Sequence, residues 1–324
     1  MAEIKAEKMA TRQAYGKTLV ELGKTTPNLV VMDADLSKST MTAEFGKAYP
    51  ERFFNMGIAE QNLYGTACGL ALSGKVVCAS TFAMFAAGRA FEIIRNSIGY
   101  THANVKICAT HAGITVGEDG ASHQTFEDIA LMRTIPGMTV LNPSDGVSAR
   151  ALIKQAVAFD GPAYIRLGRA AVPTFYTEEM GAKLEIGKGV CLRTGDKKDG
   201  KLADATVIAT GIMVNEAMLA AEELAADGIE VRVIDMHTIK PLDADIIYRA
   251  ARETGAIVTA EEHSVIDGLG SAVAEVTATH YPVKMAMVGQ QDTFGESGKP
   301  DELKAKYGMT AADIVRAVKL LIEA

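Results

Sequence analysis

The feature that most constrains this chain is its alternation of short apolar runs with stretches of helical spacing. Strands that alternate with helices favour parallel, doubly wound sheets. The runs predicted as strands lie at 29–32, 76–79, 105–109, 138–143, 162–168, 205–210, 229–234, 256–260 and 283–288. The stretches predicted as helices lie at 9–24, 56–72, 82–98, 146–158, 214–227, 244–254, 268–279 and 311–322. The sequence therefore predicts an α/β fold.

Residues 171–204 interrupt this rhythm. They are rich in Gly, Asp and Lys, a composition typical of linkers and hairpin turns. A length of 324 residues also suggests two domains of ordinary size. We therefore expect two doubly wound, mostly parallel-sheet domains, residues 1–185 and residues 186–324.

Charge and cysteine usage exclude several classes of protein. The net charge of −7 argues against a general nucleic-acid binder, which needs a basic face. No apolar run reaches the roughly 18 residues of a membrane span, and the start MAEIKAEK is too charged for a signal peptide. The four cysteines show no close pairing and lie in apolar stretches, which suits a reducing compartment. We expect a cytoplasmic protein without nucleic-acid or membrane partners.

The densest polar cluster is the segment from Thr110 to Gln124, THAGITVGEDGASHQ, which follows a predicted strand. In open parallel sheets, ligands bind beyond the carboxyl ends of strands. Histidine donates or accepts protons near neutral pH, so this segment is a candidate site for protons and hydroxyl groups. Two alternatives stay open: a solvated loop with turning glycines, and a weaker His/Asp metal site.

Two other segments carry candidate side chains. Glu60 lies in the first turn of a predicted helix, where the helix dipole favours a carboxylate, so it is also explained as a helix-start residue. Phe82 and Phe85 have the i, i+3 spacing that usually indicates helical core. The glycines near residue 268 lack a third glycine at Val273, which argues against a nicotinamide site.

Taken together, five segments resemble, in chain order, the pyrimidine-binding domain of transketolases. They are ATRQAYGKTLVEL, DADLSKST, MGIAEQNLYGTACGLALSG, STFAMF and THAGITVGEDGASHQTFEDIALMRTIPGMTVLNPSD. The string GIAEQ is less specific, because deoxyxylulose-phosphate synthases and beta subunits of 2-oxo acid dehydrogenases carry similar strings. Residues 186–324 resemble the carboxyl-terminal domain of the same superfamily, so the likeness covers nearly the whole chain.

The resemblance implies thiamine diphosphate as cofactor and assigns four side chains to it. Glu60 matches the carboxyl group that hydrogen-bonds the aminopyrimidine ring, a contact that helps the cofactor lose its reactive proton. Phe82 and Phe85 match the aromatic walls on which the pyrimidine stacks. Asp35 resembles an acidic residue beside the cofactor at a subunit interface. Glu60 is thus implied to be catalytic as well as cofactor-binding.

The resemblance also implies a sugar-phosphate site. His111 and His123 match histidines that hydrogen-bond substrate hydroxyls and assist proton transfer, and both are implied to be catalytic. Asp119 matches the residue that reads the hydroxyl next to the carbonyl. The side chains implied to bind the distant phosphate are Arg12, Ser39 and Arg169. Arg166 competes with Arg169 for that role, since both occur in YIRLGRAAVP.

One family element is missing from this sequence. Transketolases hold the cofactor diphosphate through Mg²⁺ with a Gly-Asp-Gly element and a downstream Asn, which we do not find. Asn62 also stands where many relatives have His. We therefore expect no metal ligands on this chain and a partner, the N-terminal transketolase subunit, that holds the diphosphate and most of the Mg²⁺ coordination.

The resulting hypothesis is a split transketolase, a homodimer core within a heterotetramer. It is expected to transfer a two-carbon ketol unit (a glycolaldehyde group) from a ketose phosphate to an aldose phosphate. The alternatives are a beta subunit of a 2-oxo acid dehydrogenase and a non-catalytic partner subunit. The sequence leaves the particular ketose, aldose and pathway open.

Overall fold

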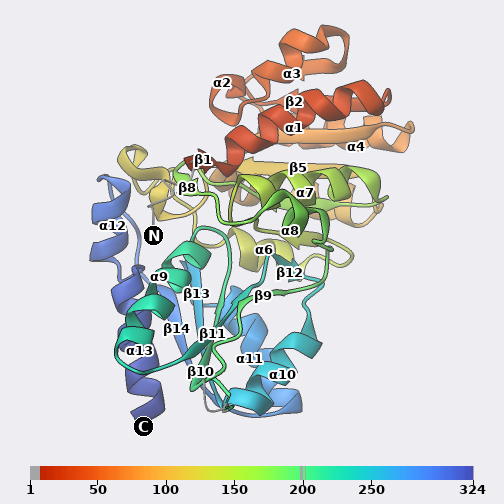
Figure 1. Ribbon diagram of the computed structural model, residues 1–324. Coiled ribbons are helices and arrows are strands. Elements are labelled where there is room, and N and C mark those ends of the chain that lie inside the picture. The colour runs from red at the N-terminus through yellow and green to blue at the C-terminus, as the bar shows by residue number, and fades with distance from the viewer. Residues whose placement is uncertain (1–7, 198–199, 201, 324) are drawn as a thin grey trace.

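Two parallel-rich sheets, each covered by helices, form the two halves of the molecule (Figure 1). The computed structural model describes residues 8–197, 200 and 202–323. A small antiparallel pair joins β1 (Lys8–Ala10) to β8 (Ala171–Pro173). The predicted α/β class with two mostly parallel sheets is confirmed.

The larger sheet has seven strands within the described residues, and all its neighbouring strands are parallel except one pair, β12 and β6. Its order is β12 (Thr238–Lys240), β6 (Thr139–Leu141), β7 (Ala163–Arg166), β5 (Val105–Thr110), β4 (Val76–Phe82), β2 (Leu29–Asp33) and β3 (Phe53–Asn55). The strands β2, β4, β5 and β7 are buried along their whole length, which explains why they read as continuous apolar runs. Because the strands are parallel, their carboxyl ends share one edge.

Helices and irregular segments join these strands. The longer helices are α1 (Thr11–Thr25), α4 (Glu60–Leu72) and α7 (Gly146–Ala158). The shorter ones are α2 (Ser37–Thr40), α3 (Ala43–Ala48), η1 (Pro50–Arg52), α5 (Phe91–Ile93), η4 (Ile114–Asp119), α6 (Asp128–Thr134) and α8 (Glu178–Ala182). The helix predicted at 82–98 differs: Phe82 ends β4, and wide π-type turns occupy η2 (Phe85–Arg89) and η3 (Ile94–Gly99). Such turns are frequent near functional sites.

The second sheet has five strands within the described residues, parallel except for β9. Its order is β14 (Lys284–Gln290), β13 (Ala256–Ser264), β10 (Ala205–Ala209), β11 (Val231–Asp235) and β9 (Val190–Arg193). Its helices are α9 (Met213–Ala226), α10 (Ala244–Thr254), α11 (Leu269–His280), α12 (Pro300–Lys306) and α13 (Ala311–Glu323). No helix in the described ranges is both long and apolar enough to cross a membrane.

A large hydrophobic cluster spans the two halves. Buried residues of the first half, such as Ile107 and Met132, belong to the same cluster as Ile234 and Met236 of the second. Strand β12, from the second half, completes the edge of the larger sheet by pairing with β6. The boundary near residue 185 falls between α8 and β9 and stays a prediction.

Candidate functional site

The residues predicted from sequence lie mainly along one edge of the larger sheet, where its parallel strands end. Asp35 follows β2, Phe82 ends β4, His111 follows β5 and Arg169 follows β7. Glu60 begins α4, shortly after β3 ends. Helices α1 and α2 contribute the remaining predicted phosphate ligands, Arg12 and Ser39. Strand-end loops of this kind are the usual ligand-binding edge of an open parallel sheet.

Four of these side chains form a ring cluster, Phe82, Phe85, His111 and His123. The rings of Phe82 and His111 are stacked with centroids 3.9 Å apart. The rings of Phe82 and Phe85 are nearly parallel at 6.1 Å, whereas His123 meets Phe85 edge-on at 5.3 Å. The structure therefore brings the predicted aromatic walls together with both predicted histidines.

His111 is held in an unusual environment. Its backbone has φ 56°, and Nδ1 lies 2.9 Å from the hydroxyl of Thr110. Burial lowers the pKa of His111 to about 3, and the positive charges of Arg12 and Arg169 act in the same direction. The imidazole is thus neutral at neutral pH, so it offers one donor and one acceptor nitrogen. Backbone strain of this kind clusters at functional sites.

The guanidinium groups of Arg12 and Arg169 lie close enough to His111 to act on it electrostatically, and they differ in their own partners. Arg12 donates to the carbonyl of Ser39 at 2.6 Å, and its Nε is buried without a partner. Burial and the positive charge of Arg169 lower the pKa of Arg12. Arg169 donates to the carbonyl of Val116 and pairs with the exposed carboxylate of Glu118 at 2.9 Å. Among the described residues, no carboxylate pairs with Arg12. An anion such as phosphate suits this arrangement.

Arg166 and Arg169 differ sharply in environment. Arg166 is 3% exposed, and its Nε lies 2.8 Å from the buried carboxylate of Asp128. Its Nη2 donates to the carbonyl of Glu262 at 2.9 Å. Arg169 keeps 34% of its side chain exposed. Of the two candidates, Arg169 is the one whose side chain is accessible to a ligand, although it pairs with the exposed Glu118.

Glu60 is a largely buried residue at the start of α4. It is 5% exposed, and the nearest cation is Nε of Arg89 at 4.0 Å. In the part of the chain that the structure describes, its carboxylate accepts no hydrogen bond. Buried polar groups are normally hydrogen-bonded. Glu60 therefore fits a ligand with which it can share a proton, as a carboxyl group does with a heteroaromatic ring nitrogen.

Asp35 and Asp119 are exposed, and neither carboxylate accepts a hydrogen bond within the described residues. Asp35 has φ 62°, and its backbone N–H donates to Asn55 at 3.0 Å. The same Asn55 oxygen accepts from Gly57 at 3.0 Å, so Asn55 ties the segment of Asp35 to the segment leading into Glu60. Sequence reasoning missed Asn55, because its short strand β3 gave no signal of its own.

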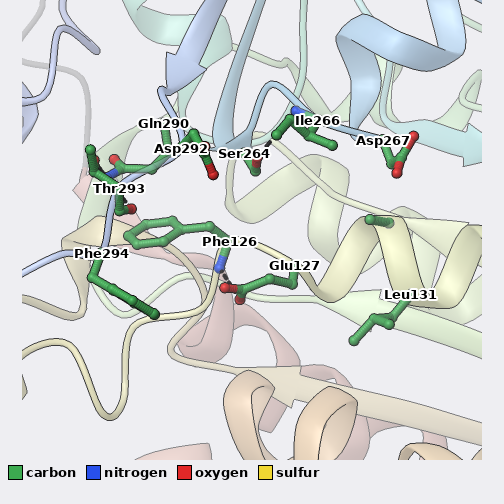
Figure 2. A pocket seen from close by; sticks show the side chains of 11 residues that line it. Phe126, Glu127, Leu131, Ser264, Ile266, Asp267, Gln290, Asp292, Thr293 and Phe294 are labelled. Carbon is green, nitrogen blue, oxygen red and sulfur yellow. Dashed lines mark hydrogen bonds between the residues drawn. The ribbon is translucent and has the colours of Figure 1, made fainter.

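A separate hollow of about 350 Å³ lies where the two halves meet (Figure 2). Its lining includes Phe126, Glu127 and Leu131 from the first half and Ser264 and Asp267 from the second. None of the predicted site residues lines it, and neither does any basic side chain. It therefore does not compete with the strand-end site for an anionic ligand.

Family profiles match most of the chain. The profile for the pyrimidine-binding domain of transketolase matches residues 7–174, and that for the transketolase C-terminal domain matches residues 197–314. A protein of Methanocaldococcus jannaschii, provisionally named a transketolase C-terminal section, is 51% identical over 95% of this chain and 94% of its own length. A 6-deoxy-6-sulfo-D-fructose transketolase subunit from a Clostridium species is 42% identical over 99% of this chain and 97% of its own.

Solved structures agree with these matches. A split-gene transketolase, described as an inactive beta4 tetramer, superposes with a TM-score of 0.89 at 55% identity, covering 97% of this chain and 99% of the other. Transketolase from Leishmania mexicana superposes with a TM-score of 0.81 at 26% identity, covering 99% of this chain but 47% of that one. Sequence and structure thus lead to one conclusion: the chain belongs to the transketolase family.

Proposed function

We propose that this chain is the pyrimidine-binding subunit of a split, thiamine-diphosphate-dependent transketolase. In that role it takes part in moving a two-carbon ketol unit from a ketose phosphate to an aldose phosphate. The observation that carries the proposal is the juxtaposition of a ring cluster with two arginines. The Phe82–His111 stack lies where the inner strands β4 and β5 end, and Arg12 and Arg169 act electrostatically on the same histidine.

The aromatic and acidic groups fit the cofactor's pyrimidine ring. Glu60 would share a proton with a ring nitrogen, donating it to the neutral ring, and so gain the hydrogen bond that its carboxyl group does not make within the described residues. Phe82 and Phe85 offer their faces for stacking, at on the order of 1 kcal/mol each. Asp35 is assigned to the rim beside the ring. When bound, the cofactor supplies the carbon nucleophile and the electron sink.

The polar groups fit a sugar phosphate. His111, neutral because of its burial, donates to or accepts from a substrate hydroxyl and passes a proton there. His123 assists this proton transfer from the neighbouring side of the ring cluster. Asp119 accepts a hydrogen bond from the hydroxyl next to the substrate carbonyl. The phosphate is assigned to Arg12, Ser39 and Arg169.

The proposal includes a second chain. The partner is an N-terminal transketolase subunit that holds the diphosphate and Mg²⁺, and two copies of this chain form the core of a heterotetramer. Support comes from the neighbour described as an inactive beta4 tetramer and from the archaeal relative named as a C-terminal section. The domain limits 1–185 and 186–324 and a cytoplasmic location belong to the same proposal.

A ketol-transfer assay tests this function. The chain is supplied with thiamine diphosphate, Mg²⁺, xylulose 5-phosphate and ribose 5-phosphate, alone and mixed with its partner. Activity in the mixture only is the expected result. Activity from the chain alone contradicts the split arrangement. Turnover of pyruvate or a branched 2-oxo acid by the mixture, without ketol transfer, contradicts the proposed reaction.

A further inference from the structure

The second half of the chain reaches directly into the loop that carries the proposed substrate residues. Glu262, on β13, is 3% exposed. Its Oε1 accepts the backbone N–H of Thr115 at 2.6 Å. Thr115 lies between His111 and Asp119, so this bond joins the second domain to the middle of the substrate loop, residues 111–124. A hydrogen bond to a carboxylate is shorter and stronger than one between neutral groups.

The loop is shaped to close over this carboxylate. Gly113 has φ 79°, a conformation that favours glycine. A Cβ atom there would lie 2.2 Å from Cδ of Glu262 and 2.5 Å from its Oε1. The backbone of residues 113–115 therefore wraps the carboxylate with no space for another side chain.

Glu262 is itself held rigidly against the first domain. Its backbone carbonyl accepts Nη2 of Arg166 at 2.9 Å, and Arg166 is paired with the buried Asp128. Two residues further on, the N–H of Ser264 donates to the carbonyl of Phe126 at 2.9 Å, just beyond the loop's end. Burial raises the pKa of the Glu262 carboxyl group, and the positive charges of Arg166 and Lys304 and the hydrogen bond from Thr115 oppose that rise. The anchor is thus fixed on a strand rather than on a mobile segment.

A second contact from the same domain holds the far end of the loop. Gln124 donates through Nε2 to the carbonyl of Glu296 at 2.9 Å. A Cβ at Gly120 would lie 2.5 Å from Oγ of Ser297, so the segment before α12 lies directly against the loop. In Figure 1, α12 lies beside this part of the first half. The middle and the end of the loop are therefore both tied to the second domain.

We propose that Glu262 is a positioning residue that sets the geometry of the substrate loop from the second domain. It touches no reacting atom. By fixing the amide of Thr115, it fixes the direction in which His111 and Asp119 face sugar hydroxyl groups. This inference rests on the proposed function for its catalytic consequence, but the anchoring itself does not.

The test compares Glu262→Gln and Glu262→Ala with Glu261→Gln in the full chain. Glu261 is an equally buried neighbour on β13, but its carboxylate accepts the N–H groups of Leu269 and Gly270 at the start of α11, not the loop. Hydrogen–deuterium exchange of peptides spanning 111–124 reports the anchor without any activity measurement. Glu262→Ala is expected to speed exchange there about tenfold or more, and Glu262→Gln less, because the amide oxygen still accepts. Glu261→Gln should leave this loop unchanged.

The kinetic arm uses the mixture with the partner chain. The Glu262 variants are expected to raise KM for xylulose 5-phosphate about tenfold while the apparent Kd for thiamine diphosphate stays within about twofold. Wild-type exchange rates in the loop of both Glu262 variants would overturn the proposal, as would equal acceleration by Glu261→Gln. If exchange responds as expected but the wild-type mixture transfers no ketol unit, the anchor stands and the proposed function falls.

Discussion

At the scale of single residues, Arg166 and Arg169 lie three positions apart in the sequence but have different environments, one buried and one exposed. Sequence alone could not choose between them, because each is an arginine in the same short segment after a strand. The strand β7 ends at Arg166, so its side chain still points into the core toward Asp128. Arg169 lies beyond the strand, in the loop that reaches the substrate site. The choice depends on where the strand ends, and boundaries are the least predictable part of an element.

This difference predicts opposite effects of the same substitution. Arg166→Met should lower the free energy of unfolding by about 3–5 kcal/mol, because it leaves the carboxylate of Asp128 buried and unpaired. Arg169→Met should change stability by less than about 1 kcal/mol, because its partner Glu118 is exposed. Arg169→Met should instead raise KM for sugar phosphates by about tenfold or more. Denaturant titration and steady-state kinetics measure the two effects, and equal destabilisation by both variants would contradict the assignment.

Substitution of Glu60 is predicted to reduce catalysis without changing the stability of the fold. Glu60→Gln should reduce ketol transfer by about 10²-fold or more, since an amide cannot supply or take the proton. Its unfolding free energy should stay within about 0.5 kcal/mol of wild type, because within the described residues no hydrogen bond to that carboxylate is lost. Glu92→Gln, at an exposed carboxylate that accepts from Asn96, is the matched control and should keep activity. Near-normal turnover by Glu60→Gln would remove Glu60 from its role.

Asp235 predicts a pH dependence of stability. It is fully buried, it accepts from Ser144 at 2.6 Å and Tyr176 at 2.9 Å, and burial raises its pKa to about 7. The folded protein therefore retains the proton that the unfolded chain releases near pH 4, so this contribution to stability falls as pH rises toward 7. Relative to Asp235→Asn, wild type should lose about 1.4 kcal/mol per pH unit between pH 5 and pH 6. If the denaturant midpoints of wild type and Asp235→Asn changed with pH in the same way across this range, the raised pKa of Asp235 would be refuted.

At the scale of elements, the helices and strands were predicted best where the apolar residues follow a single clear pattern. The predicted helix at 244–254 coincides with α10, and the buried strands β2, β4 and β5 begin at the predicted residues. The predicted helix at 56–72 begins only at Glu60. The three-residue strands β3 and β12 were missed, because so short a run carries no period and forms only where a neighbouring strand pairs with it.

Close packing between helices gives a prediction at this scale. Gly23 of α1 lies against Tyr49, and a Cβ there would be 2.2 Å from the ring. That ring is fixed by a hydrogen bond to the carbonyl of Val20 and by Arg52 above its face. Gly23→Ala should therefore destabilise the fold by about 1–3 kcal/mol despite the better helix propensity of Ala.

The control for this substitution is Gly69→Ala. Gly69 is also inside a helix, α4, but a Cβ there meets nothing within 4 Å. Its replacement should stabilise the isolated chain by about 0.5–1 kcal/mol. Thermal or denaturant unfolding of both variants decides the point. Destabilisation by Gly69→Ala and not by Gly23→Ala would show that close packing against Tyr49 does not decide the effect.

At the scale of the whole molecule, the sequence predicted well which residues lie together at the candidate site. It predicted poorly how the two halves of the chain contact each other. The predicted ends of the strands identified the edge of the larger sheet at which Phe82 and His111 contact each other, because parallel strands place their carboxyl ends at the same edge. The contact of Glu262 with Thr115 spans 147 positions and has no local pattern. It is decided by the packing of one domain on the other, which no sequence period describes.

This joining of the halves predicts that the chain unfolds as one unit. One hydrophobic cluster extends across both sheets, and β12 supplies the first sheet with a strand from the second half. Lys240 also donates to the carbonyls of Arg133 and Ile135 at 2.7 and 2.6 Å. Separating the halves would expose this shared cluster, so neither should melt alone.

Hydrogen exchange with mass spectrometry at increasing guanidinium concentration measures this directly. Core peptides from β4 and β5 and those from β10 and β13 should lose protection at the same denaturant midpoint. Arg166→Met should shift both sets together, because Arg166 bonds to Asp128 in one half and to the carbonyl of Glu262 in the other. Two separate midpoints would mean that the halves are independent folding units. The second domain could then not hold the substrate loop at a fixed angle, because its own docking would be lost while the first sheet stayed intact.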